Sequence, residues 1–304
     1  MNARRSSRDR HVNATVTSTH PYLSVDERKV NLKRIATKKR FVPSDYEQIL
    51  GPYLDTHENM RYCDYVHEEE IGDRRILLIR HDIDHDHLTA HKVAQWEADR
   101  GLRATYCVLH TAWYYGKLEG DRHVHTQDLV DLVVALHELG HEINFHNNVV
   151  VTRLKAGIDP KALLRNELEA LRSYGVPVTG TSSHGDALCR ELNFRNWEIF
   201  SECCDERFGG PRTLRYDGPN GQMSIELGAM SMHEFGLDYE GYDVLRDQYH
   251  TESGGRQRTV QHARGRRRFG RHDYERGEVI GVLTHPEWWD FGAIEPAPAT
   301  PTLR

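Results

Sequence analysis

The stretch Ile76-Leu77-Leu78-Ile79-Arg80-His81-Asp82-Ile83-Asp84 is the most informative part of this sequence. Its first four residues form an unbroken apolar run, which is typical of a strand buried on both faces of a parallel sheet. Two carboxylates follow, Asp82 and Asp84, and their spacing of two residues points both side chains to the same side of an extended backbone. Because aspartates after a strand often serve only as helix caps, the pair has to be weighed with the rest of the sequence.

Outward from this stretch, the sequence alternates between predicted strands and predicted helices. Further strands are expected at residues 104–109, 142–146, 178–182 and 279–283. The helices between them are expected at residues 88–100, after the N-cap Thr126, and after the N-cap Asp159. Because repeated β-α order implies parallel strands joined by crossover helices, the sequence predicts an α/β fold.

The composition predicts one large domain between two tails. Residues 1–40 carry few large apolar side chains and indicate a disordered basic leader, and the Pro/Ala/Thr-rich residues 293–304 indicate a disordered tail. Residues 41–292 are enough to bury a single core. Within them the pattern is weakest from residue 186 to 275, where a short strand is expected at 223–227 and a basic, glycine-rich stretch covers 254–271.

Charge and cysteine content exclude several classes of protein. The net charge of −6 gives no general case for binding nucleic acid or a membrane surface, and no apolar run reaches the roughly 20 residues of a membrane span. The five cysteines form no Cys-x-x-Cys pair, which favours a reduced, cytoplasmic setting. The arginines of the basic stretch have only Phe269 interleaved, so we interpret it as a solvated loop.

Polar side chains recur at the points where predicted strands end. Asp82 and Asp84 follow the first strand, His146 ends the third, His184 follows the fourth, and His285 follows the last. The carboxyl ends of the strands in a parallel α/β barrel meet at one mouth, so these residues are expected to converge. Two carboxylates and three imidazoles are a donor set for a divalent metal with acid and base groups. Each residue alone has a structural interpretation as a cap, a buried histidine or a turn residue, so the hypothesis depends on their agreement.

With these residues in place, the chain resembles the polysaccharide deacetylase superfamily, the NodB-homology fold of carbohydrate esterases. It is most similar to the divergent branch whose first motif is of the HDVD type. Four segments carry the resemblance in the family's order, and they span about residues 75–290: Ile76 to Tyr106 with His81-Asp82-Ile83-Asp84, Leu139 to His146, Thr181 to Gly185, and Gly281 to Pro286. The resemblance implies a distorted (β/α) barrel that removes acetyl groups, usually from amino sugars, with bound zinc or a similar cation.

The resemblance also implies roles for individual residues. It makes Asp82 the catalytic base, His285 the general acid, and Asp84 and His146 metal ligands. The family's metal motif has a second histidine four residues after the first, where this chain has Val150, which cannot bind a metal. The expected metal triad is therefore incomplete.

The third motif also departs from the family's pattern. The family has an Arg-x-Pro-Tyr sequence there that orients the base, and this chain has Ser183-His184-Gly185. We hypothesise that His184 supplies the missing third metal ligand. Asn147 is a candidate for binding sugar hydroxyls and Trp288 for stacking on a sugar ring, although turn formation and core packing are the structural alternatives.

The predicted function is that of a metal-dependent hydrolase that removes an acetyl or similar acyl group from an amino sugar, glycan precursor or glycoside. One alternative is a barrel that has kept the scaffold and lost the chemistry, and that acts as a binding or scaffold protein. A second alternative is an amidohydrolase, whose His-x-His signature would be His85-Asp86-His87. That signature lies beyond the expected strand end, and no lysine is an obvious metal bridge.

Overall fold

A computed structural model describes residues 25–292, apart from 70, 205, 207–208, 219, 245–247 and 262–277. The expected tail at 293–304, the leader up to residue 24 and positions 262–271 of the basic stretch lie outside the described residues. None of the helices in the described ranges has the length and apolar character that a membrane crossing requires.

The main sheet is built around β2 (Arg75–Ile83), the strand at the centre of the sequence analysis. The strand order is β10-β7-β6-β3-β2-β13-β11-β12, and β1 pairs additionally with β2. All neighbours are parallel except β11 and β12. The other strands are β1 (Glu58–Met60), β3 (Thr105–Leu109), β6 (Glu142–Asn147), β7 (Gly180–Ser183), β10 (Tyr239–Glu240), β11 (Gln248–Thr251), β12 (Arg258–Gln261) and β13 (Glu278–Thr284).

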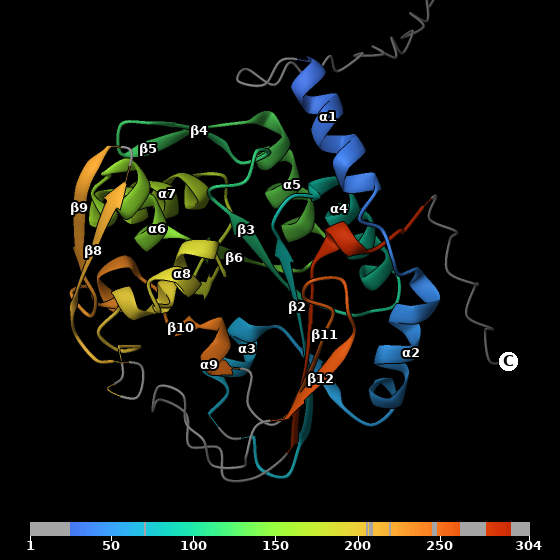
Figure 1. The fold of residues 1–304 in the computed structure, drawn as a ribbon. Coiled ribbons are helices and arrows are strands. Elements are labelled where there is room, and N and C mark those ends of the chain that lie inside the picture. Colours follow the sequence, from blue (N-terminus) through green and yellow to red (C-terminus); the bar gives the residue numbers. More distant parts are fainter. Residues whose placement is uncertain are drawn as a thin grey trace, which may run out of the picture.

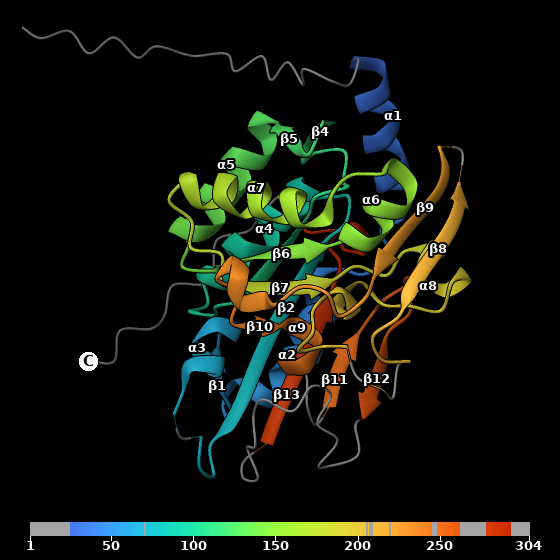
Figure 2. The same ribbon diagram turned by 90° about the vertical axis from the view of Figure 1, so that its left-hand side faces the viewer.

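This sheet curls into a half-barrel, which Figures 1 and 2 show from two directions. Its end strands, β10 and β12, do not pair with each other in the part of the chain that the structure describes. The α/β class and the parallel order of the predicted strands are therefore confirmed. The carboxyl ends of β2, β6, β7 and β13 lie at one edge of the sheet, because these strands are parallel and in register.

The crossover helices form where caps and apolar stripes predict them. In α5 (Gln127–Glu138) the Thr126 side chain accepts from Leu129 N, and in α7 (Pro160–Ser173) Asp159 accepts from Ala162 N. Their apolar stripes are buried in the main core, together with the inner face of α4 (His87–Ala98). Figures 1 and 2 show α4, α5 and α7 together on one side of the sheet.

Several elements have no clear signal in the sequence. The strand expected at 223–227 is β9 (Gly221–Glu226), but it pairs with β8 (Thr213–Gly218) in a separate antiparallel hairpin. A second hairpin joins β4 (Gly116–Glu119) and β5 (Arg122–His125). The remaining elements are α2 (Pro43–Leu54), which is as long as α4 and α5, and the shorter α3 (Tyr62–His67), α6 (Val149–Ala156), α8 (Ala187–Glu191), α9 (Gly241–Val244) and the 3-10 turns η1 (Asn196–Ile199), η3 (Met232–Phe235) and η4 (Pro286–Trp288).

The N-terminal segment differs from the sequence prediction. Composition predicts disorder up to residue 40, but residues 25–36 form helix α1 (Val25–Ala36) and the residues after it pair with the end of the domain. The Arg40 and Phe41 amides donate to the Trp288 carbonyl, and the Asp290 amide donates to the Phe41 carbonyl. Backbone pairing of this kind leaves no trace in side-chain hydropathy, so composition does not predict it.

Candidate metal centre and active site

The structure brings together the residues that the sequence analysis places at strand ends. Asp82 is the second-to-last residue of β2, and Asp84 directly follows the strand. His146 lies in β6, His184 directly follows β7, and His285 directly follows β13. Asp82 lies within ion-pair distance of two of these histidines: its Oδ2 atom is 3.6 Å from His146 Nε2 and 3.9 Å from His285 Nε2.

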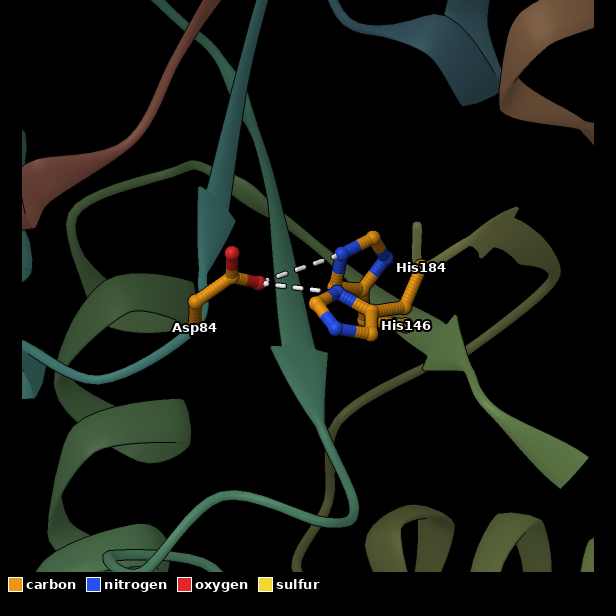
Figure 3. A group of neighbouring side chains, drawn as sticks. All are labelled: Asp84, His146 and His184. Carbon is orange, nitrogen blue, oxygen red and sulfur yellow. Dashed lines mark ion pairs between the residues drawn. The ribbon is translucent and has the colours of Figure 1, made fainter. Parts of the chain in front are cut away.

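Asp84, His146 and His184 form a cluster that has the donors of a metal site (Figure 3). Asp84 Oδ1 lies 3.2 Å from His184 Nδ1 and 3.4 Å from His146 Nε2. One ligand atom from each residue lies within 4.8 Å of the other two. Tetrahedral zinc with bonds of 2.0–2.1 Å places its ligand atoms about 3.3 Å apart, so these separations match a zinc-sized ion.

Hydrogen bonding around the cluster leaves the correct atoms free for a metal. His146 Nδ1 lies 2.8 Å from the Ser182 carbonyl oxygen, and only a protonated Nδ1 can donate to that acceptor. The lone pair of His146 is therefore on Nε2, which faces Asp84. The Asp84 Oδ1 atom is buried and faces the two imidazole nitrogens of the cluster. The donor set thus fits a divalent cation.

Val150, four residues after His146, is a core residue. It lies in α6, where its side chain is fully buried in the main hydrophobic core. His184 comes from the neighbouring strand end, and the structure places it beside Asp84 and His146. Its role as a metal ligand stays a prediction.

The pKa values within the cluster are shifted by the close contact between Asp84 and the two imidazoles. Burial opposes ionisation of Asp84, but His184 and His146 outweigh it and hold the pKa of the carboxyl well below its ordinary value. Burial likewise opposes protonation of His184, and the Asp84 charge reverses this and raises the pKa of the imidazole. The cluster therefore already favours a positive charge beside the Asp84 carboxylate.

Asp82 is held by a residue whose role the sequence analysis did not recognise. Arg80 Nε donates to Asp82 Oδ1 and Arg80 Nη2 to Asp82 Oδ2, each at 2.7 Å, and both side chains are buried. Burial raises the pKa of Asp82, but the charges of Arg80, His146 and His285 outweigh it and lower the value to about 2. The Asp82 carboxylate is therefore ionised at neutral pH, and the bidentate contact with Arg80 fixes its orientation.

His285 has a carboxylate partner on its other side. Its Nδ1 atom lies 3.5 Å from Glu252 Oε2, and Glu252 Oε1 accepts from the His285 amide and from Trp289 Nε1. Burial disfavours the imidazolium, but Glu252 first and then Asp84 and Asp82 raise the pKa of His285 to about 10. Glu252 could not be recognised from the sequence, because it follows β11 in the region where the strand and helix pattern is weakest.

Two predicted substrate residues have different outcomes. Asn147 is buried, its Nδ2 donates to the Asn196 carbonyl and its Oδ1 accepts from the Val149 amide, which favours the turn-forming alternative over binding of substrate. It forms the turn into α6. Trp288 is half-buried in η4 just beyond His285, whereas Trp289 is buried in the core with its ring centre 5.4 Å from that of Tyr46.

The other histidines near the site have structural roles or lie outside the cluster. His141 is buried, its Nδ1 accepts from the Ala104 amide and its Nε2 donates to the Ala94 carbonyl, as expected for a structural residue. In the His-x-His sequence of the amidohydrolase alternative, Asp86 caps α4 and His87 is buried against Tyr114. The metal-type cluster among the described residues does not include this sequence.

Comparison with protein-family models, with curated proteins and with solved structures finds no match for this chain. Function is therefore inferred from the geometry of the site and from the motifs in the sequence.

Proposed function

We propose that this protein is a metal-dependent hydrolase, on a barrel of the polysaccharide deacetylase type, that removes an acetyl or similar acyl group from an amino sugar, glycan precursor or glycoside. The observation that carries the proposal is a three-donor cluster beside a carboxylate and an imidazole that face each other, with Asp82 Oδ2 3.9 Å from His285 Nε2. A carboxylate that can accept a proton and an imidazole that can donate one, on either side of a metal-type cluster, are the groups that hydrolysis of an amide or ester uses.

Asp84, His146 and His184 would hold the cation, and zinc suits a set of two imidazoles and one carboxylate. A divalent ion supplies Lewis-acid chemistry, which activates water and polarises the acyl carbonyl. The Ser182 carbonyl fixes the His146 ring through Nδ1, so that residue meets the ion with no change of tautomer.

Asp82 accepts the proton that the attacking water loses. Arg80 has two functions here, because its double hydrogen bond orients the carboxylate and its charge keeps the carboxylate ionised inside the protein. In this chain Arg80 is on the same strand as the base. It therefore does the work that the family's third motif assigns to an arginine, and which Ser183-His184-Gly185 cannot do.

His285 donates its proton to the leaving nitrogen or oxygen of the sugar as the bond to the acyl carbon breaks. Glu252 keeps His285 protonated and fixes the direction of its ring, so that Nε2 faces Asp82 across the site. The products are the free carboxylic acid and the amine or hydroxyl. Each proton that moves is accounted for by Asp82 and His285.

The test measures metal content and acetate release on the purified full-length protein. We expect about one equivalent of zinc per chain and release of acetate from at least one member of a panel of N- and O-acetylated sugars. His184→Ala removes one of three ligands, so we expect loss of most bound metal and of activity. His91→Ala, which changes an exposed histidine on α4, serves as the matched control and retains both.

Two results would contradict the proposal in different ways. Full metal occupancy in His184→Ala would show that this residue is not a ligand. Neither metal nor acetate from the wild-type protein would favour the non-catalytic scaffold in place of the enzyme.

A further inference from the structure

A short basic segment borders the site on the side of His285. Arg40 donates its amide to the Trp288 carbonyl at 2.8 Å, and Trp288 is only three residues beyond His285 in the turn η4. Lys38 Nζ binds Glu287 Oε1 at 2.8 Å, in the same turn. In Figure 1 the blue connection between α1 and α2 runs beside the red turn that follows β13. Residues 38–40 therefore lie against the turn that follows His285, the proposed proton donor. This segment is called the rim below.

The three basic side chains of this segment differ in how their charges are compensated. Lys38 is paired with Glu287, and Lys39 binds the carboxylate of Asp86, the Thr89 hydroxyl at 2.8 Å and the Pro286 carbonyl at 3.1 Å. Arg40 is exposed, and no carboxylate of the described residues forms an ion pair with its guanidinium. Arg40 is thus the uncompensated cation of the rim.

The Arg40 side chain has a defined position although it is exposed. Its guanidinium carbon lies 5.7 Å from the centre of the half-buried Trp288 ring, a cation–π contact. Gly255 packs against both residues, because a Cβ added there would lie 2.9 Å from Arg40 Nε and 2.8 Å from Trp288 Cζ3. Gly255 also donates to the carbonyl of Glu252, the partner of His285. One tight turn therefore supports the cation and the proton donor together.

We propose that the substrate carries an anionic group, a phosphate or a carboxylate, which the Arg40 guanidinium binds beside Trp288. This inference rests on the proposed function for the acyl-sugar part of the substrate. The planar guanidinium can donate two parallel hydrogen bonds to such oxyanions, and its contact with the Trp288 ring holds it in place. The rim thereby selects charged sugars over neutral ones.

The test measures equilibrium binding by calorimetry, which needs no turnover. The anionic ligands are N-acetylglucosamine 1-phosphate, N-acetylglucosamine 6-phosphate and an N-acetylated uronic acid, and the neutral ligand is N-acetylglucosamine. We expect at least one anionic sugar to bind about tenfold more tightly than the neutral one, with a preference that weakens at high salt. Which ligand binds best distinguishes a phosphate from a carboxylate.

Arg40→Gln should abolish this preference and leave binding of the neutral sugar unchanged, whereas Arg165→Gln, an exposed arginine on α7, should preserve it. Equal binding of charged and neutral sugars, an unchanged preference in Arg40→Gln, or no binding of any anionic sugar would overturn the inference. Binding that depends on Arg40 without any acetate release would instead count against the proposed function alone. Acetate release from charged and neutral sugars with equal affinity would count against the inference alone.

Discussion

At the scale of single residues, each of the two groups that the proposed mechanism uses to move a proton is paired with a buried charge of opposite sign. Arg80 binds both oxygens of Asp82, and Glu252 contacts His285. Because these charges are buried with their partners, the protonation states are set by the protein rather than by the solvent. The base stays ionised and the acid stays protonated at neutral pH.

Glu252→Gln tests this pairing through the pH dependence of acetate release. The pKa of His285 is raised to about 10, chiefly by Glu252, so wild-type activity should persist into alkaline conditions and fall as the imidazolium loses its proton. Removal of the Glu252 charge lowers that pKa, and the alkaline limb of kcat should move to lower pH. Glu226→Gln, an exposed change on β9, should leave the profile unchanged. An alkaline limb that does not move in Glu252→Gln would exclude His285 as the acid.

The residues of the site were predictable only where the sequence marks a strand end. Asp82, Asp84 and His285 follow long apolar strands, and His146 ends one, so their convergence follows from parallel order alone. Arg80 directly follows the apolar run Ile76–Ile79, but nothing in the sequence distinguishes a buried arginine that pairs with a carboxylate from an arginine at the surface. Glu252 follows the four-residue strand β11, which is too short to stand out.

At the scale of elements, a buried carboxylate fixes the β4–β5 hairpin to α7. Glu167 lies 2.8 Å from His125 Nε2 and 3.1 Å from His123 Nδ1, and it accepts from the His123 amide. Burial opposes ionisation of Glu167, but hydrogen bonds from His123 and His125 outweigh it and lower the pKa of the carboxyl. The hairpin has only two strands, so contacts of this kind determine whether it stays attached.

We expect Glu167→Gln to lower the free energy of unfolding by about 1–3 kcal/mol at pH 7, because buried hydrogen-bond donors lose a charged acceptor. A carboxyl with a lowered folded-state pKa contributes stability that is complete above its unfolded value of about 4.3 and is lost as pH falls through the folded value. The difference between wild type and variant should therefore shrink on acidification, as measured by urea unfolding. Glu169→Gln on the exposed face of α7 is the control, and a difference that grows at low pH would contradict this account.

Helices with both a side-chain cap and an apolar stripe were predicted well, whereas α2, which is equally long and has no side-chain cap, was not predicted. Helices α5 and α7 carry both a cap and an apolar stripe, so local sequence determines them. The strands β8 and β9 alternate weakly in burial and are stabilised by each other and by contacts with α6. Contacts of that kind depend on tertiary structure, so the sequence around 223–227 indicated a strand without indicating its partner.

At the scale of the whole molecule, the proposed ion would join segments that are far apart in the chain. Asp84, His146 and His184 follow or end three different strands, β2, β6 and β7, of the same sheet. Because the unfolded chain lacks this arrangement, an ion bound there stabilises only the folded state. The sheet and the site are therefore expected to be coupled energetically.

Addition of zinc to metal-depleted protein should consequently raise the unfolding temperature. A free ion concentration of one hundred times Kd contributes about 2.7 kcal/mol, which corresponds to a shift of roughly 5–10 °C in a protein of this size. Differential scanning calorimetry should show the shift in wild type and in His91→Ala, and not in His184→Ala. A shift of equal size in His184→Ala would place the stabilising ion elsewhere in the molecule.

The pairing of residues 38–41 with the turn after β13 has a consequence for the order in which the protein assembles. Lys38 and Glu287 are 249 residues apart in sequence, yet they lie in contact beside His285. At a synthesis rate of about 5–20 residues per second, the early segment leaves the ribosome roughly 12–50 s before its partner exists. The half-barrel can begin to fold from β2 onward during that interval, but the rim is completed last. A nascent chain therefore has no finished binding site until translation has passed η4.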